Sequence, residues 1–337
     1  MAKTMKAWQY TSVAGGMEQN LFINDAAPRP TPGDKELLVQ VHAMALNPVD
    51  YKVTESGAPL RLLGPVFTPG SDYCGTVADV GKSVQGFTKG QYVFGCKVGD
   101  LARGTLAQYI VVKAEHAAVL PAGMDAQAGA TVGICGLTEM QALAPHVEAG
   151  DKVFINGGSG GTGTYGVQIA KALGCHVTTT CSTANVQLCR DLGADDVLDY
   201  KTVQVLQALA DKGRVFNLVV DNIGAPANLY RASNSFLVPG GRFVQVGMTP
   251  SLRGMLQVGG NVLRPAFLGG GKAKYHMLMA QASQTNLQQL AQWLDEGKIK
   301  PVVDEVFEWE DAPKAYAKQK LGRVKGKIVI KVPQDKE

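Results

Sequence analysis

A glycine-dense turn lies near the middle of the chain, between a strand-like and a helix-like segment. Gly158, Gly160 and Gly163 form the pattern G-x-G-x-x-G. Residues 153–156 before it suit a buried strand, and residues 162–173 after it have helical spacing. In this setting the first glycine permits a tight turn, the second lets a pyrophosphate approach the backbone, and the third lets the helix pack against the strand. The turn therefore predicts a dinucleotide site at a helix N-terminus.

The residues after the next predicted strand indicate which dinucleotide binds. Sites for NAD carry an Asp or Glu about 20 residues beyond the glycine motif, where it holds the ribose 2′-hydroxyl. Here Thr180 and Cys181 are followed by Ser182 and Asn185, and the first acid is Asp191. A carboxylate would repel a 2′-phosphate, whereas hydroxyl and amide groups donate hydrogen bonds to it. The sequence therefore favours NADPH, although no Arg lies in this loop.

The residue types that bind metals do not cluster. The five histidines lie in different segments without paired spacing, and no two of the six cysteines form C-x-x-C. Catalytic zinc needs three protein ligands, and structural zinc usually needs four cysteines. We therefore expect no metal site. Carbonyl polarisation would then come from side-chain donors, and the redox chemistry from the nicotinamide.

Composition narrows the class of protein. The chain has 337 residues, 45% hydrophobic and 18% charged, which is typical of a globular protein with two domains. Its net charge of +4 comes without a basic block, so no nucleic-acid partner is expected. No apolar run is long enough to span a membrane. The opening MAKTMKAWQY lacks the features of a signal or transit peptide, so we expect a cytoplasmic protein with reduced, buried cysteines.

The order of the elements predicts an α/β protein with two different halves. Up to about residue 120 the pattern is one of short strands and turns, with strands expected at 36–46, 74–81 and 91–95. From about residue 130 strands and helices alternate, which is typical of a parallel sheet with helices on both faces. A final strand within 324–332 is expected to return to the first half. An edge strand within 261–275 would suit a homodimer, and a monomer is the alternative.

Nearly the whole chain resembles a known family. The stretches ALNPVDYKV, GLTEMQAL, GGSGGTGTYGVQIAKALG, LGADDVLDYKT and VVDNIG are similar, in this order, to the medium-chain dehydrogenase/reductases. The chain resembles their zinc-independent quinone oxidoreductase branch, and is most like plant NADPH-dependent alkenal/enone reductases and chloroplast-envelope quinone oxidoreductase-like proteins. Zinc-containing relatives have a Cys ligand near Asn47 and GHE at residues 70–72, where this chain has Gly-Ser-Asp.

The resemblance implies a GroES-like, β-rich catalytic domain over residues 1–128 and 276–337, a Rossmann NADP-binding domain over 129–275, and an active cleft between them. The pyrophosphate would lie on the glycine turn, the adenosine 2′-phosphate beside the loop after the second strand, and the nicotinamide beside the ends of later strands. The cofactor-binding residues that the resemblance implies are Thr138, Gly158, Ser159, Gly160, Gly161, Thr162, Gly163, Ser182, Asn185, Tyr200, Asn222, Val246 and Gly247.

The resemblance also implies three catalytic candidates. Asn47 would lie beside the nicotinamide. Simple quinone reductases have NFIDTY where this chain has NPVDYK, so Lys52 replaces their Tyr and Tyr51 precedes it. A Lys at this place would hydrogen-bond to a substrate carbonyl and stabilise the enolate formed by hydride addition. The alternatives are a solvated surface lysine at Lys52, a packed aromatic ring at Tyr51 and a turn residue before Pro48 at Asn47.

The expected activity is NADPH-dependent reduction, without zinc, of the activated C=C bond of an α,β-unsaturated ketone or aldehyde, or of a quinone. Hydride would move from nicotinamide C4 to the β-carbon, and a proton would follow at the α-carbon. Two alternatives stay open: an enoyl reductase that acts in trans in a biosynthetic pathway, and a non-catalytic NADPH-binding protein. Loops around residues 59–67, 99–105 and 248–260 are expected to wall the substrate pocket.

Overall fold

The computed structural model of the chain describes residues 3–56, 64–100, 102–247, 258–261 and 270–334. The chain forms two compact units. A β-rich unit contains Met1–Leu137, Gln281–Gly297 and Pro301–Glu337, and an α/β unit contains Thr138–Ala280 and Lys298–Lys300. None of the helices in the described part of the chain combines the length and apolar character that a bilayer crossing demands.

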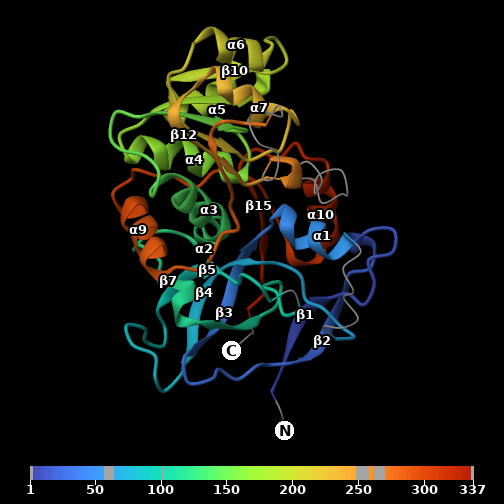
Figure 1. Cartoon of the computed structure of the whole chain (residues 1–337). Coiled ribbons are helices and arrows are strands. Elements are labelled where there is room, and N and C mark those ends of the chain that lie inside the picture. Colours follow the sequence, from blue (N-terminus) through green and yellow to red (C-terminus); the bar gives the residue numbers. More distant parts are fainter. Residues whose placement is uncertain (1–2, 57–63, 101, 248–257, 262–269, 335–337) are drawn as a thin grey trace. The chain divides into compact units, whose positions relative to one another are not determined.

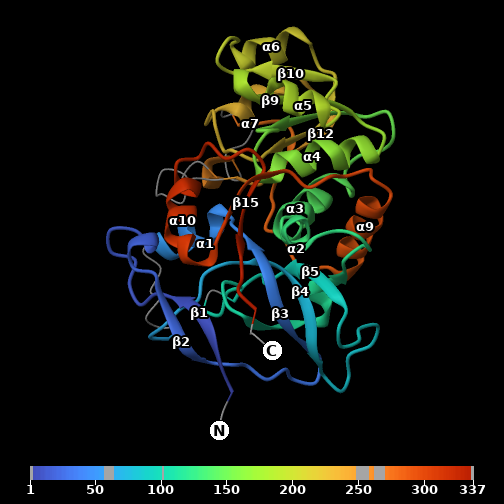
Figure 2. The same cartoon turned by 180° about the vertical axis from the view of Figure 1, so that it is seen from behind.

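The β-rich unit is built around one long strand. β3 (Glu36–Ala45) pairs antiparallel with β4 (Asp72–Val80), β6 (Tyr109–Lys113) and the C-terminal β15 (Lys327–Lys331). Figure 2 shows β15 beside β3, as the final segment was predicted to lie. The sheet order is β14-β15-β3-β4-β5-β7, with β6 paired to β3. Its other strands are β5 (Tyr92–Cys96), β7 (Ala117–Val119) and β14 (Val303–Phe307), and β1 (Thr4–Gln9) and β2 (Phe22–Pro28) form a separate hairpin (Figure 1).

The helix that follows β3 carries two of the catalytic candidates. α1 (Pro48–Glu55) begins where the alternating strand pattern ends, with Pro48 at its first position, where the missing N–H costs nothing. Asp50 lies in its first turn, where a carboxylate is stabilised by the helix dipole. The other helices of this unit are α2 (Ala126–Ala130), the first part of α3 (Gly133–Leu143), α9 (Gln284–Asp295) and α10 (Ala312–Lys320).

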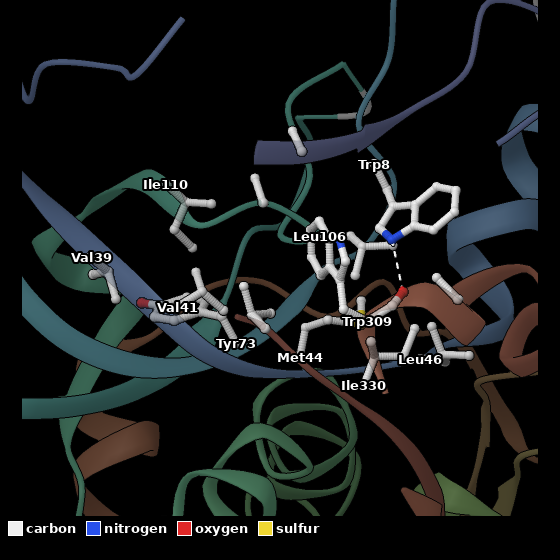
Figure 3. Packing of buried hydrophobic residues seen from close by; sticks show 14 of the residues in the cluster. Trp8, Val39, Val41, Met44, Leu46, Tyr73, Leu106, Ile110, Trp309 and Ile330 are labelled. Atoms are coloured by element: carbon white, nitrogen blue, oxygen red, sulfur yellow. Dashed lines mark hydrogen bonds between the residues drawn. The ribbon is translucent and has the colours of Figure 1, made fainter. Parts of the chain in front are cut away.

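Apolar side chains from distant parts of the chain form the core of the β-rich unit (Figure 3). Trp8 and Trp309 pack with ring centroids 6.2 Å apart, and the Trp8 indole N–H donates to the Trp309 carbonyl at 2.9 Å. Met44 from β3 and Ile330 from β15 are fully buried in the same cluster. The core therefore joins the N-terminal and C-terminal segments of the chain.

The α/β unit has the strand order of a Rossmann fold. The six strands in its described part are all parallel, in the order β10-β9-β8-β11-β12-β13. This is the doubly wound 3-2-1-4-5-6 order, which reverses between β8 and β11, and ligands bind outside the carboxyl ends of strands at such a reversal. The predicted fold class is confirmed. The strands are β8 (Lys152–Asn156), β9 (His176–Cys181), β10 (Asp196–Asp199), β11 (Phe216–Asp221), β12 (Leu237–Gln245) and β13 (Lys274–Met277), with β13 at the edge.

Short helices connect these strands (Figure 1). They are α4 (Gly161–Ala172), α5 (Val186–Asp191), α6 (Val205–Asp211) and α7 (Leu229–Ala232). α4 packs on β8 and β9, so the helix after the glycine turn lies on the strand that precedes it and the strand that follows it. All six cysteines of the chain are buried thiols outside any disulfide, as predicted.

Candidate functional site

The glycine turn between β8 and α4 is held tightly against β9. Gly157 has a φ of +91°, which favours glycine, and its N–H donates to the Thr180 hydroxyl at 2.8 Å. A Cβ on Gly158 would lie 2.2 Å from the Thr179 Oγ1, and a Cβ on Gly163 would lie 2.0 Å from the Gly157 carbonyl oxygen. The glycines at 158 and 163 are therefore required by the packing of the turn itself.

Gly160 is different, because none of the described residues requires a glycine there. It precedes α4 with a φ of −81°, which any residue adopts, and a Cβ would meet only the Gly157 carbonyl oxygen, at 3.8 Å. The backbone at the start of α4 thus faces open space, next to the N–H groups of Gly161 and Thr162 in the first helical turn. An open cradle at a helix N-terminus fits the pyrophosphate of a dinucleotide.

Replacing Gly160 with alanine is expected to weaken NADPH binding about 100-fold without unfolding the protein, because the new methyl group fills space that only the pyrophosphate needs. The dissociation constant is measured from the fluorescence of the bound reduced nicotinamide, together with the melting temperature. Gly163→Ala is the matched control, and its Cβ should lower the melting temperature itself. Unchanged affinity in Gly160→Ala would show that the phosphates bind elsewhere.

The loop predicted to bind the adenosine end joins the glycine turn directly. Ser182 follows β9, and the Asn185 Nδ2 donates to the Ser159 Oγ at 3.1 Å. Tyr200 is 53% exposed, and its N–H donates to the Cys181 carbonyl at 3.1 Å. The structure therefore brings Ser159, Ser182, Asn185 and Tyr200 to one end of the sheet.

A cation beside this loop, Lys201, was not predicted from the sequence. The Lys201 Nζ lies 5.6 Å from the centroid of the Tyr200 ring. In the sequence, its position next to the predicted Tyr200 was the one feature that could have identified it. The neighbouring Asp199 accepts the Lys201 N–H at 2.9 Å. A hydrogen bond from Thr183 lowers the pKa of Asp199, and its carboxylate is thus occupied by protein donors. Lys201 therefore places a positive charge next to Tyr200.

The residues predicted at the nicotinamide side follow the two strands beyond the reversal. Asn222 comes after β11, and its N–H donates to the Asn156 carbonyl at 3.3 Å. The N–H groups of Val246 and Gly247, after β12, donate to the Asp221 carbonyl at 2.9 and 3.0 Å. A Cβ on Gly247 would lie 2.1 Å from the Asn222 carbonyl oxygen, so glycine permits this close approach.

A buried acid adjoins this group. Glu139 is fully buried on α3, next to Thr138, and its Oε1 accepts from the Asn222 Nδ2 at 2.5 Å. Burial raises the pKa of Glu139 to about 8, although the Asn222 hydrogen bond opposes this. Glu139 is the one charged residue of α3, and that feature of the sequence could have revealed it.

In the β-rich unit, Asn47 belongs to a buried polar network. Its Nδ2 donates to the Asp72 Oδ2 at 2.8 Å, and its Oδ1 accepts from the Lys327 Nζ at 2.5 Å. Lys327 also pairs with the Asp72 Oδ2 at 3.0 Å, and the Ile134 N–H donates to the Asp72 Oδ1 at 2.7 Å. Burial lowers the pKa of Lys327, but the Cys135 thiol and the Asp72 carboxylate raise it more, and the net shift is upward. Lys327 therefore remains an ammonium ion here.

This network reaches the start of α1 through Asp50. The Asp50 Oδ2 accepts the Asn47 N–H at 2.8 Å, and its Oδ1 accepts from the Ser71 hydroxyl at 2.6 Å. Burial raises the pKa of Asp50 to about 7, although both hydrogen bonds lower it. A cavity of about 80 Å³ borders Asp50, Thr54 and Ser71. Asn47 and Asp50 thus fix the helix that carries Tyr51 and Lys52.

Tyr51 and Lys52 have different surroundings. Tyr51 packs against the core of the β-rich unit, with the Lys320 Nζ 5.3 Å from its ring centroid. Lys52 lies about 100° further around α1, and it is half-buried without a hydrogen-bond or ion-pair partner in the described part of the chain. Burial lowers the pKa of Lys52. The Tyr51 ring thus contacts the core and Lys320, whereas the Lys52 amine contacts no charged or hydrogen-bonding group in the described part of the chain.

The described residues contain no group of three His, Cys, Asp or Glu side chains that could hold a metal ion. Of the loops expected to wall the substrate pocket, residues 59–63, 101 and 248–257 lie outside the described residues. The sites in the two units are therefore defined by the glycine turn and strand ends in one, and by α1 and its polar network in the other.

Comparisons with known proteins agree with this geometry. Two family models match, the alcohol dehydrogenase GroES-like domain over residues 33–122 and a zinc-binding dehydrogenase model over residues 192–330. The trans-enoyl reductase pgmF of Aspergillus terreus is 43% identical over 98% of this chain and 97% of its own. Quinone-oxidoreductase QR1 of Triphysaria versicolor is 31% identical over 97% and 98%. The solved quinone oxidoreductase from Coxiella burnetii superposes with a TM-score of 0.84 at 27% identity, covering 98% of this chain and 100% of that one. The chain therefore belongs to the medium-chain dehydrogenase/reductases, oxidoreductases that use a nicotinamide cofactor, and to their quinone oxidoreductase branch.

Proposed function

We propose that this protein is an NADPH-dependent reductase of conjugated acceptors, namely α,β-unsaturated ketones and aldehydes or quinones. The observation that carries the proposal is Lys52, a half-buried amine without a partner among the described residues, on a helix that a buried polar network holds in place. Such an amine suits an oxygen that gains negative charge during the reaction. Lys201, beside the acid-free loop after β9, supports NADPH over NADH.

When bound, the cofactor supplies the hydride. The residues of this chain would bind the cofactor, orient the substrate and stabilise the enolate. The glycine turn would hold the pyrophosphate on the N-terminus of α4, and Ser182, Asn185, Tyr200 and Lys201 would surround the 2′-phosphate. Lys52 would donate a hydrogen bond to the substrate oxygen and stabilise the enolate that forms as the β-carbon is reduced. Tyr51 would support α1 by packing beneath it, and Asn47 would fix the start of that helix.

A second candidate is a trans-acting enoyl reductase. The 43% identity to a trans-enoyl reductase favours it, because the identity extends over 98% of this chain. An enoyl thioester is also a conjugated carbonyl, and Lys52 would serve its oxygen in the same way. The two candidates differ in the substrate that carries the double bond, not in the chemistry of the site.

The proposal is tested by following oxidation of NADPH, and separately of NADH, with an alkenal, a cyclic enone, a linear enone, a p-quinone and an enoyl thioester. Turnover of the enones, much faster with NADPH, is the expected result. Turnover of the thioester alone would favour the trans-acting reductase, and turnover of the quinone alone would remove the role of Lys52. Tight NADPH binding without any turnover would favour a non-catalytic protein.

Replacing Lys52 with methionine is expected to lower kcat for an enone about 100-fold, which is the usual cost of losing one donor to a developing oxyanion. NADPH affinity should stay within about twofold, because the amine is assigned to the substrate and not to the cofactor. Steady-state kinetics and a binding titration measure both quantities. Lys52→Arg is the matched control and should retain more activity than Lys52→Met. Equal kcat values in all three proteins would contradict the assignment.

A further inference from the structure

We propose that Glu139 is a positioning residue for the nicotinamide end of the cofactor: it holds the amide nitrogen of Asn222, and so directs the amide oxygen of Asn222 to the carboxamide N–H of the bound ring. This inference rests on the NADPH site proposed above and deepens it. It assigns a role to a buried acid that the reduction itself does not use.

The first argument is the unequal satisfaction of the Asn222 side chain. Its Nδ2 donates to the Glu139 Oε1 at 2.5 Å, whereas its Oδ1 is buried without a hydrogen-bond partner among the described residues. A buried acceptor without a donor costs about 1–3 kcal/mol. Native sites tolerate such an atom where a ligand supplies the missing donor. The Asn222 Oδ1 is therefore an acceptor to which a bound ligand can donate a hydrogen bond.

The second argument is the place of this oxygen. Asn222 follows β11 and is bonded through its N–H to Asn156, the last residue of β8. The adjoining Ile223 side chain lies against Gly157, where a Cβ would be 2.6 Å from its Cδ1. The unpaired oxygen thus lies at the strand ends beside the glycine turn, where the sheet order reverses. A reduced nicotinamide ring carries one group with N–H donors, its carboxamide.

The third argument is that the α/β unit makes room for the acid. Gly166 of α4 faces the Glu139 carboxyl group, and a Cβ there would lie 2.6 Å from the carboxyl carbon. Glu139 has no ion-pair partner among the described residues, and its Oε2 is buried without a hydrogen bond. Burial keeps the carboxyl group protonated at neutral pH, so it holds Asn222 without placing a negative charge near the ring.

The test compares NADPH with 2′-phospho-ADP-ribose, which has the same phosphates and both riboses but no nicotinamide. Glu139→Met removes the acceptor at similar volume, and Glu139→Gln keeps it. We expect Glu139→Met to weaken NADPH binding about 10-fold, which is the worth of one such hydrogen bond. Binding of 2′-phospho-ADP-ribose should stay within about twofold, and Glu139→Gln should bind both ligands nearly as wild type does.

Two further measurements separate positioning from structural support. Asn222→Ala should show the same selective loss, and the double variant should lose no more than either single one, because both act through one contact. An analogue with an acetyl group in place of the carboxamide lacks the N–H donor. It should bind wild type and Glu139→Met with equal affinity.

Equal weakening of both ligands in Glu139→Met and Asn222→Ala, or unchanged NADPH affinity in both, would overturn the inference. So would a wild-type protein that binds 2′-phospho-ADP-ribose as tightly as NADPH. The fate of the proposed function is read separately: selective loss of NADPH affinity in a protein that reduces no enone or quinone would support the role of Glu139 while the proposed reaction fails.

Discussion

Replacing Lys327 with methionine is expected to lower the free energy of unfolding of the β-rich unit by about 3–5 kcal/mol, which is the usual cost of removing one partner from a buried ion pair. Lys327 is 2% exposed and Asp72 is fully buried, so water cannot replace the lost ammonium group. The Asp72 carboxylate would keep only the Asn47 amide and the Ile134 N–H as donors. Urea unfolding near neutral pH measures the change.

The control for Lys327→Met is the double variant with Asp72→Asn. The single variant leaves a buried anion without its cation, whereas the double variant leaves no buried charge in the pair. We therefore expect the double variant to be more stable than Lys327→Met alone. Measuring Asp72→Asn alone as well completes the cycle that gives the coupling energy between the two groups. A loss below about 1 kcal/mol in Lys327→Met would mean that the pair behaves like an exposed one.

Replacing Glu139 with glutamine is expected to change how stability depends on pH. The pKa of Glu139 is about 8 in the folded protein, against 4.5 for an ordinary Glu. Between these values the unfolded chain releases a proton that the folded chain keeps, so unfolding becomes easier as the pH rises. Relative to wild type, Glu139→Gln should therefore gain about 3 kcal/mol between pH 5 and pH 8.

Urea unfolding of both proteins across this pH range tests the expectation. The raised pKa of Asp50 acts in the same direction, but it is common to both proteins and cancels in their difference. The difference well below pH 4.5 gives the cost of the amide itself, because Glu139 is then protonated in both states. Parallel stability curves for the two proteins would show that Glu139 is ionised, or reaches water, in the folded protein.

Local patterns in the sequence predicted the α/β unit well. The glycine turn, the strand before it and the helix after it are neighbours in the chain, so the residue types of each element support the assignment of the other two. The alternation of strands and helices indicated a parallel sheet. Because crossover connections between parallel strands are right-handed, few arrangements of such a sheet are possible. The absence of an acid from the loop after β9 was also evident from the sequence, because Ser182 and Asn185 come shortly after the strand.

The polar network around Asn47 was not predictable in this way. Asn47 and Lys327 are 280 residues apart, and each looks ordinary in its own segment. Proximity to a nicotinamide, the role implied for Asn47, stays a prediction, whereas its bonds to Asp72 and Lys327 are observed. Glu139 was missed because the sequence alone does not show that this charged residue of α3 is fully buried beside Asn222, 83 positions away in the chain. Lys201 was missed because the cation lies after β10 rather than in the loop after β9.

The pairing of β15 with β3 also dictates an order of events during synthesis. Residues 138–280 of the α/β unit are contiguous apart from a short later segment, so this unit can fold while the ribosome is still making the rest. The β-rich unit cannot, because the ammonium group that neutralises Asp72 and the strand that covers one end of β3 both arrive with Lys327–Lys331. Its first half must wait, with an unpaired edge and an uncompensated anion, until Lys327–Lys331 have emerged. We expect nascent chains stalled before β15 to recruit chaperones through this half, while their α/β unit already binds NADPH.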